Sequence, residues 1–362
     1  MAAVEKEEDN KVLSDHLSAF KKIVSSKLDG SKKVALFTHR CPDPDAIGSM
    51  MGMAWLLQNA FGVESTSFFD GQIAHPQNGA ICNLLDPQLI SVQEYNPENY
   101  CLNILLDTVP VNAGVGDKKV DFDIVIDHHK EIPNGGFKGL FINLRAGSCC
   151  ATVLQLFNLS NRFFEHDVDH DRKVATAMIA GIVTDTENML SDDTTSYEFE
   201  AFSRLFEFRD QLSLKDIVSF KRPKFWIDTK AAAVASAKID SEGLAVVGLG
   251  IIPEKQRDLI ADMADDMIKW MSVETAIVFA IVQGDRIEGS VRSDNASVSV
   301  SDFCKRLAGL HGQGGGKQGK GAYRYDLAGA GIDADEPEDI KTRLWEVIKE
   351  KEYHRIIRLA KK

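Results

Sequence analysis

The stretch that decides the fold reads Phe37-Thr38-His39-Arg40-Cys41-Pro42-Asp43-Pro44-Asp45-Ala46-Ile47-Gly48-Ser49. Residues 34–37 are apolar and predict a short buried strand, and residues 46–60, which contain no proline, predict a helix. One imidazole and two carboxylates therefore stand on a loop after a strand, where open α/β sheets bind ligands. Carboxylate oxygens beside an imidazole suit Mn²⁺ or Mg²⁺. A polar turn in which Asp45 caps the helix would explain the same pattern.

Similar side chains follow two more predicted strands and one predicted helix. Asp107 comes directly after the apolar residues 102–106, and Asp127-His128-His129 comes after residues 122–126. Asp185 stands at the end of a small-residue helical run. Because parallel strands bring their carboxyl ends to one edge of a sheet, these side chains should meet. A centre for two metal ions about 3.5–4 Å apart is thus predicted from His39, Asp43, Asp45, Asp107, His128 and Asp185.

The order of these motifs resembles that of the DHH family of phosphoesterases. The family includes RecJ-type exonucleases, family II pyrophosphatases and the nano-RNA/pAp phosphatases (the NrnA-like group), and this chain is closest in plan to the last of these. The resemblance implies that Asp107 and Asp185 bridge the two metals and that His129 is a catalytic residue facing the scissile phosphate. It assigns the remaining ligands to two sites: His39 and Asp43 to one, Asp45 and His128 to the other.

Composition limits the class of protein. The chain has 362 residues, enough for two domains, and 44% of them are hydrophobic. A net charge of −12 argues against a protein that coats long nucleic acid with a basic surface. Six scattered cysteines without a Cys-x-x-Cys pair predict a reduced, cytoplasmic protein. No apolar run could span a membrane, and residues 1–10 lack the features of a signal peptide.

The second half of the chain contains a hairpin signal and a glycine-rich run. Gly284-Asp285 separates two strand-like segments and predicts a hairpin. The run Leu310-His311-Gly312-Gln313-Gly314-Gly315-Gly316-Lys317-Gln318-Gly319-Lys320-Gly321-Ala322 predicts a segment without regular structure, whose N–H groups could approach an anion. A flexible surface loop is the alternative. The start of the helix expected from Cys149 is a second place for a phosphate, or an ordinary helix cap.

The resemblance gives the second half a role in substrate binding. The DHH-associated C-terminal domain carries a Gly-Gly-Gly-His loop that binds the nucleotide or phosphate of the substrate, and an Arg-Ser strand end. In this chain Lys317 stands at the histidine position, and His311 could replace the missing imidazole. The implied substrate-binding residues are Arg292, Ser293, His311, Gly314, Gly315, Gly316 and Lys317.

The expected fold class is α/β, with two domains. An N-terminal parallel-sheet DHH domain and a smaller C-terminal α/β domain would enclose a catalytic cleft. The boundaries are 1–32 for an acidic tail and helix, 33–209 for the catalytic domain, 210–238 for a linker and connecting helix, 239–335 for the substrate-binding domain and 336–362 for a helical extension.

The expected activity is hydrolysis of a phosphoester by water that two divalent cations activate. Mn²⁺ is preferred, with Mg²⁺ or Co²⁺ as alternatives. The expected substrates are short oligoribonucleotides, the linear dinucleotides pApA and pGpG, or 3′-phosphoadenosine 5′-phosphate (pAp). An exopolyphosphatase or pyrophosphatase, and a non-catalytic nucleotide sensor on the same fold, are the alternatives. No membrane or long duplex is expected as partner, and the family resemblance is compatible with a homodimer.

Overall fold

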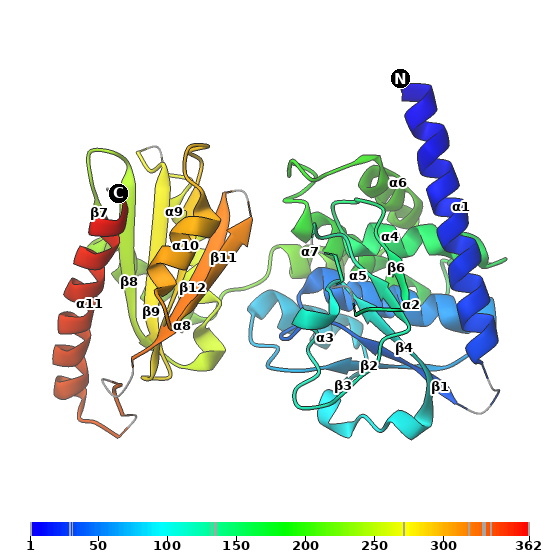
Figure 1. Cartoon of the computed structure of the whole chain (residues 1–362), viewed down its shortest axis with the longest axis horizontal. Coiled ribbons are helices and arrows are strands. Elements are labelled where there is room, and N and C mark those ends of the chain that lie inside the picture. The colour runs from blue at the N-terminus through cyan, green and yellow to red at the C-terminus, as the bar shows by residue number, and fades with distance from the viewer. Residues whose placement is uncertain are drawn as a thin grey trace. The chain divides into compact units, whose positions relative to one another are not determined.

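The structure is a computed structural model that describes residues 2–360, apart from 29, 31, 131, 134, 135, 271, 318, 328–330 and 334. Gln318 of the glycine-rich run thus lies outside the described residues. The chain divides into two compact units, Met1–Lys221 and Arg222–Lys362 (Figure 1). The division falls within the segment 210–238 that was expected to link two domains. None of the helices in the described part is both long and apolar enough to cross a membrane.

The first unit is built on a six-stranded sheet in which every pair of neighbours is parallel. Its order is β3-β2-β1-β4-β5-β6. Strands β1, β5 and β6 read as nearly continuous apolar runs because both faces of a parallel sheet are buried. Their bounds are β1 Lys33–Phe37, β2 Ser65–Phe69, β3 Leu89–Ser91, β4 Tyr100–Leu106, β5 Ile124–Ile126 and β6 Leu140–Ile142.

Helices cover one face of this sheet, and aromatic rings cover the other. Leu36, Ile104 and Ile126 face the core shared with the helices. On the opposite face the ring of Phe37 stacks on Phe68, with 5.4 Å between ring centroids. The helices of the unit are α1 Ala2–Lys27, α2 Pro44–Phe61, α3 Pro76–Leu85, α4 Cys149–Leu156, α5 Asp169–Asp185, α6 Ser196–Leu205 and α7 Gln211–Val218.

Helix α2 begins two residues earlier than the apolar pattern indicated. The residue that caps it is Asp43, whose Oδ1 accepts a hydrogen bond from the N–H of Ala46 at 3.0 Å. Pro44 takes the first helical position, where proline needs no N–H partner. The alternative in which Asp45 caps this helix is therefore wrong, and Asp45 lies within the first turn.

The second unit contains a mixed sheet of order β11-β12-β10-β9-β8-β7. Strands β8 and β9 are parallel, and the other neighbours are antiparallel. The hairpin predicted around Gly284 is confirmed, since β9 and β10 flank it and Gly284 has a φ of +81°. The strand bounds are β7 Lys238–Ile239, β8 Leu244–Ile252, β9 Thr275–Val282, β10 Arg286–Ser293, β11 Gln313–Lys317 and β12 Lys320–Asp326.

Two layers of helices enclose this second sheet. Helices α8 (Lys224–Ser236) and α9 (Leu259–Met267) pack on the face that carries Val247 and Val278. Helices α10 (Val300–Ala308) and α11 (Glu338–Ala360) pack on the face that carries Phe279. Since α11 holds most of the extension expected at 336–362, that segment belongs to the core of the second unit.

The glycine-rich run contains regular structure, contrary to the prediction. Residues 313–317 form β11, an edge strand paired with β12, whereas their glycine content predicted no regular structure. The reason is steric. A Cβ on Gly314 would lie 2.2 Å from the carbonyl oxygen of Cys304 in α10, and one on Gly316 would lie 2.4 Å from that of Lys320. The glycines thus allow this strand to pack closely.

Candidate metal centre

The predicted side chains stand at one edge of the first sheet. His39 follows β1, Asp107 follows β4, and Asp127, His128 and His129 follow β5. These three strands are neighbours, so their carboxyl ends lie together. Asp107 has a φ of +62°, in the left-handed region that aspartate tolerates better than most residues. The prediction that these strand-end side chains lie close together is therefore confirmed.

Two glycines bring the helical carboxylates to the same place. Helices α2 and α5 cross so closely that a Cβ on Gly48 would lie 2.7 Å from the carbonyl oxygen of Ala177. A Cβ on Gly181 would lie 2.8 Å from the Cα of Asp45. Because no side chain separates the helices here, Asp45 in α2 and Asp185 at the end of α5 both reach the edge of the sheet.

The first cluster gathers around His39. Its Nε2 lies 3.5 Å from Oδ2 of Asp107 and 3.8 Å from Oδ2 of Asp43. Its Nδ1 lies 3.0 Å from the carbonyl oxygen of Arg40, which orients the ring if that nitrogen carries the proton. The ring therefore turns Nε2 toward the two carboxylates.

The second cluster gathers around His128. Its Nε2 lies 3.3 Å from Oδ1 of Asp107, 3.3 Å from Oδ2 of Asp185 and 3.9 Å from Oδ2 of Asp45. Asp107 thus directs one oxygen toward each imidazole and belongs to both clusters. All six predicted side chains are brought together.

The donor atoms fit divalent cations. Two sets, His39 with Asp43 and Asp107 and Asp45 with His128 and Asp185, each have ligand atoms within 4.8 Å of one another. Oδ1 of Asp107 and Nε2 of His128 are buried, and within the described part of the chain neither has a geometrically good hydrogen bond. Buried polar atoms usually make well-aligned hydrogen bonds, so two that face each other at 3.3 Å without one suggest a ligand there. Carboxylate oxygens with imidazole nitrogens are suitable ligands for Mn²⁺.

The electrostatics of the cluster also favour a cation. Burial raises the pKa of the Asp45 carboxyl well above its ordinary value, and the charges of Asp107 and Asp185 raise it further. Burial would raise the pKa of Asp107 too, but its contacts with His128 and His39 lower it. Burial would lower the pKa of His128, yet the surrounding carboxylates raise it to about 10. A bound cation would replace the proton on that imidazole and offset the repulsion among the acids.

Asp45 accepts hydrogen bonds from the start of α4, which the sequence suggested as a possible phosphate site. The N–H groups of Cys149 and Cys150, in the first turn of α4, donate to Oδ2 and Oδ1 of Asp45 at 2.6 and 2.9 Å. The next N–H, that of Ala151, donates to the side chain of Ser148. Since these donors are occupied, the idea that this helix start binds a phosphate is wrong. Its partial positive charge acts on a carboxylate of the site instead.

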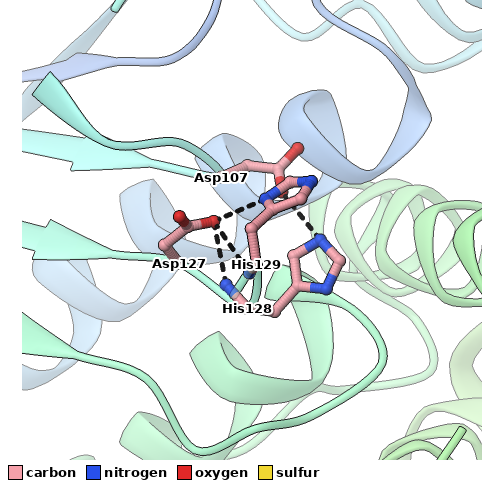
Figure 2. Close-up of side chains that lie close together, drawn as sticks. All are labelled: Asp107, Asp127, His128 and His129. Carbon is pink, nitrogen blue, oxygen red and sulfur yellow. Dashed lines mark hydrogen bonds and ion pairs between the residues drawn. The ribbon is translucent and has the colours of Figure 1, made fainter. Parts of the chain in front are cut away.

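Asp127 is a site residue that the sequence argument did not single out. It is fully buried, and its Oδ1 accepts from the N–H groups of His128 and His129 and contacts Nδ1 of His129 at 2.8 Å (Figure 2). Its place as the first residue of Asp-His-His was the available signal. Burial lowers the pKa of His129, but the hydrogen bond to Asp127 and the charges of Asp107 and Asp127 raise it, and that pKa lies above its ordinary value.

Replacement of Asp127 should show whether this residue positions His129 or contributes to metal binding. We expect Asp127→Ala to lower kcat by about a hundredfold, because His129 loses the group that fixes its ring. Asp127→Asn should recover much of this loss, since its amide oxygen can still accept the backbone N–H bonds. Steady-state kinetics with each variant, together with the shift in Tm on adding Mn²⁺, would test this. Equal loss in both variants would show that charge, not orientation, matters.

Of the residues predicted to bind substrate in the second unit, two make contacts within the protein and two are exposed. Nε and Nη2 of Arg292 donate to the two oxygens of Asp265 at 2.6 and 3.1 Å, and its side chain is 11% exposed. The hydroxyl of Ser293 is buried against Thr275 at 2.9 Å. His311 and Lys317 are exposed. The substrate roles of these residues, and the cleft between the domains, stay predictions.

The chain is similar in sequence to known proteins, and its first part matches a family model. Residues 33–182 match the model of the DHH family, N-terminal domain. An uncharacterised protein of Methanocaldococcus jannaschii is 29% identical over 83% of this chain and 60% of its own length. The cyclic-di-AMP phosphodiesterase PdeA of Listeria monocytogenes is 24% identical over 77% of this chain and 43% of its own. The chain thus spans less than two thirds of both relatives.

Another relative and a solved structure match over most of their length. The "Probable bifunctional oligoribonuclease and PAP phosphatase NrnA" of Streptococcus mutans is 26% identical over 92% of this chain and all of its own. The crystal structure of an exopolyphosphatase-related protein from Bacteroides fragilis covers 93% of this chain and 96% of its own, at 16% identity and a TM-score of 0.64. That likeness shows a shared fold. With its parallel sheet and strand-end cluster, residues 33–182 of this chain form a DHH-family N-terminal domain.

Proposed function

We propose that this chain is a metal-dependent phosphoesterase that hydrolyses short oligoribonucleotides, linear dinucleotides such as pApA and pGpG, or pAp. The observation that carries the proposal is the position of Asp107, whose two oxygens reach two imidazoles that belong to separate carboxylate clusters. A single carboxylate shared in this way is the arrangement expected of a two-metal site.

In this proposal each cluster holds one divalent cation, Mn²⁺ by preference. His39 and Asp43 hold one, His128 and Asp45 hold the other, and Asp107 and Asp185 bridge them. Bound cations would supply charge neutralisation at the phosphoryl oxygens and a water of lowered pKa. The chain's own contribution is to fix these ligands on strand ends and on the closely packed helices α2 and α5.

His129 would act on the phosphate itself. Asp127 holds Nδ1 of the ring, so Nε2, on the opposite side, is left to contact substrate. The side chain of His129 is 38% exposed, whereas that of His128 is 7% exposed. A raised pKa favours the protonated ring, which can donate a hydrogen bond to a phosphate oxygen or a proton to the leaving group.

The choice of substrate is supported by two of the relatives. Their names describe action on cyclic-di-AMP and on oligoribonucleotides and PAP, all of them nucleotides. A net charge of −12 fits a small substrate bound by metals and local cations better than a long strand held by a basic surface. Localisation in the cytoplasm and assembly as a homodimer stay predictions.

The test is product release from a substrate panel in the presence of Mn²⁺. The panel contains pApA, pGpG, a short RNA, pAp, tripolyphosphate and a long single strand of DNA. We expect turnover of one or more of the small nucleotides, and its loss after chelation. Turnover of tripolyphosphate alone would replace the proposal with a polyphosphatase. If no substrate of the panel is turned over although calorimetry shows Mn²⁺ binding, the proposal is contradicted.

A further inference from the structure

The segment 143–149, which joins β6 to α4, contacts the candidate metal centre at several points. The side-chain amide of Asn143 donates a hydrogen bond to the carbonyl oxygen of His129 at 2.8 Å. A Cβ on Gly147 would lie 3.2 Å from the side chain of Thr186, which directly follows a predicted ligand. The end of the segment, in the first turn of α4, supplies the N–H groups that hold another predicted ligand. The segment therefore borders the site.

Arg145 lies in the middle of this segment in an unusual conformation. Its φ is +55°, in the left-handed region that costs a residue other than glycine free energy. The amide oxygen of Asn143 accepts a hydrogen bond from its N–H at 2.8 Å, so one side chain ties the backbone of Arg145 to that of His129. Leu144 and residues 146–157 are all buried, whereas Arg145 is exposed. Strained residues of this kind cluster at active sites and ligand clamps.

Three basic residues follow strands at this edge of the sheet, and they differ in their partners. Arg40, after β1, lies 3.6 Å from a carboxylate oxygen of Asp70. Lys130, after β5, lies 3.4 Å from one of Asp193. Within the residues that the structure describes, the guanidinium of Arg145, after β6, makes neither a hydrogen bond nor an ion pair. Arg145 can therefore form two parallel hydrogen bonds with a phosphate without giving up a partner in the protein.

The strand order places Arg145 to one side of the metal clusters. Asp107 follows β4 and His128 follows β5, and β6 is the next strand, at the edge of the sheet. Arg145 thus lies two strands away from the strand that ends at Asp107, on the far side of His129. A phosphate held by the two clusters and His129 is separated from Arg145 by the strand between them. The next phosphate along the substrate is the one that Arg145 is placed to bind.

We propose that Arg145 determines specificity by binding a second phosphate of the substrate, next to the one that is hydrolysed. The inference rests on the proposed function, because it takes the scissile phosphate to lie at the metal centre. It narrows the substrate class to nucleotides that carry a further phosphate beside the scissile one, such as pApA or pGpG. The dinucleotide ApA, which has the same internal phosphodiester but no 5′-phosphate, is then a poorer substrate.

Steady-state kinetics with Mn²⁺ on pApA and ApA, which differ only in the 5′-phosphate, tests this role. We expect Arg145→Met to raise KM for pApA about tenfold or more, because a charge-assisted contact with phosphate is lost. Its kcat for pApA and its KM for ApA should stay unchanged. Arg145→Lys should recover part of the loss, since an ammonium keeps the charge but not the paired donors. The matched control is Arg172→Met, the same change at an exposed position at the start of α5.

A stability readout separates binding from folding. Glycine adopts a φ of +55° without strain, so Arg145→Gly should keep the Tm of the wild type or raise it. The same variant should raise KM for pApA as Arg145→Met does. If Arg145 served only the structure, its replacement would change Tm and leave the preference for pApA over ApA intact.

Each result counts for or against the inference. A wild-type KM for pApA in Arg145→Met would overturn it and leave the phosphoesterase in place. An equal rise in KM for pApA and ApA would also overturn it, because Arg145 would then act on a group that both share. Calorimetry with a chelator present measures binding of the two dinucleotides without turnover. A chain that hydrolyses neither, yet binds pApA more tightly than ApA through Arg145, would keep the second-phosphate site and lose the phosphoesterase. Neither turnover nor binding of pApA would overturn both.

Discussion

Asp107→Asn is expected to abolish metal-dependent hydrolysis. The substitution keeps the shape of the side chain but removes the charge that reaches both His39 and His128. Losing several kcal/mol of charge stabilisation, at about 1.4 kcal/mol for each factor of ten, should lower kcat/KM on the order of a thousandfold or more. The measurement is turnover of the best substrate of the panel at saturating Mn²⁺.

A second readout distinguishes loss of metal from loss of fold. Mn²⁺ should raise the Tm of the wild type, because a ligand that binds only the folded state stabilises it, and should raise that of Asp107→Asn much less. The matched control is Asp117→Asn, the same change at an exposed position of the same unit. Wild-type turnover in Asp107→Asn would remove Asp107 from the site and contradict the two-metal proposal.

Glu352→Ala is expected to destabilise the second unit by about 3 kcal/mol, the cost typical of breaking a buried charge pair. Glu352 in α11 is only 2% exposed. It accepts hydrogen bonds from the hydroxyls of Tyr323 and Tyr325 at 3.1 and 2.6 Å and from the guanidinium of Arg355 at 2.6 and 2.7 Å. Alanine would leave two phenols, and Nε and Nη2 of that guanidinium, without their acceptor, while Nη1 keeps its bond to the carbonyl oxygen of Leu307.

Chemical denaturation followed by tryptophan fluorescence measures this effect. Three of the chain's four tryptophans, Trp226, Trp270 and Trp345, lie in the second unit, so the signal reports mainly on it. The control is Glu350→Ala, two residues away on the same helix, whose pair with Lys238 is half exposed on both sides and should matter little. Equal midpoints for Glu352→Ala and the wild type would show that this network does not anchor α11.

The clustering of the candidate ligands could be predicted from sequence because it depends on local patterns. Each ligand stands next to an apolar run, and strand ends of a parallel sheet meet at one edge. That reasoning placed His39, Asp107 and His128 without any knowledge of long-range contacts. The start of α2 was predicted two residues too late because the apolar pattern begins after Pro44, whereas the helix begins at it.

The features that the sequence did not predict depend on contacts between distant segments. The N–H groups that hold Asp45 come from Cys149 and Cys150, more than a hundred residues later. The strand formed by residues 313–317 depends on how closely α10 and β12 approach it, which glycine content alone cannot indicate. The register of β11 also decides that Gly315 faces open space, whereas Gly314 and Gly316 face neighbouring backbone.

The central position of β1 has a consequence for the order in which the first unit can fold. Of the strands in this sheet, β1 is the first to emerge from the ribosome. Its two neighbours are β2 and β4, and β4 begins only at Tyr100. Strand pairings so far apart in sequence raise the contact order and slow folding. During synthesis, therefore, one edge of β1 must wait unpaired for more than sixty residues of chain, and nascent chains shorter than this are the ones we expect to need chaperone protection.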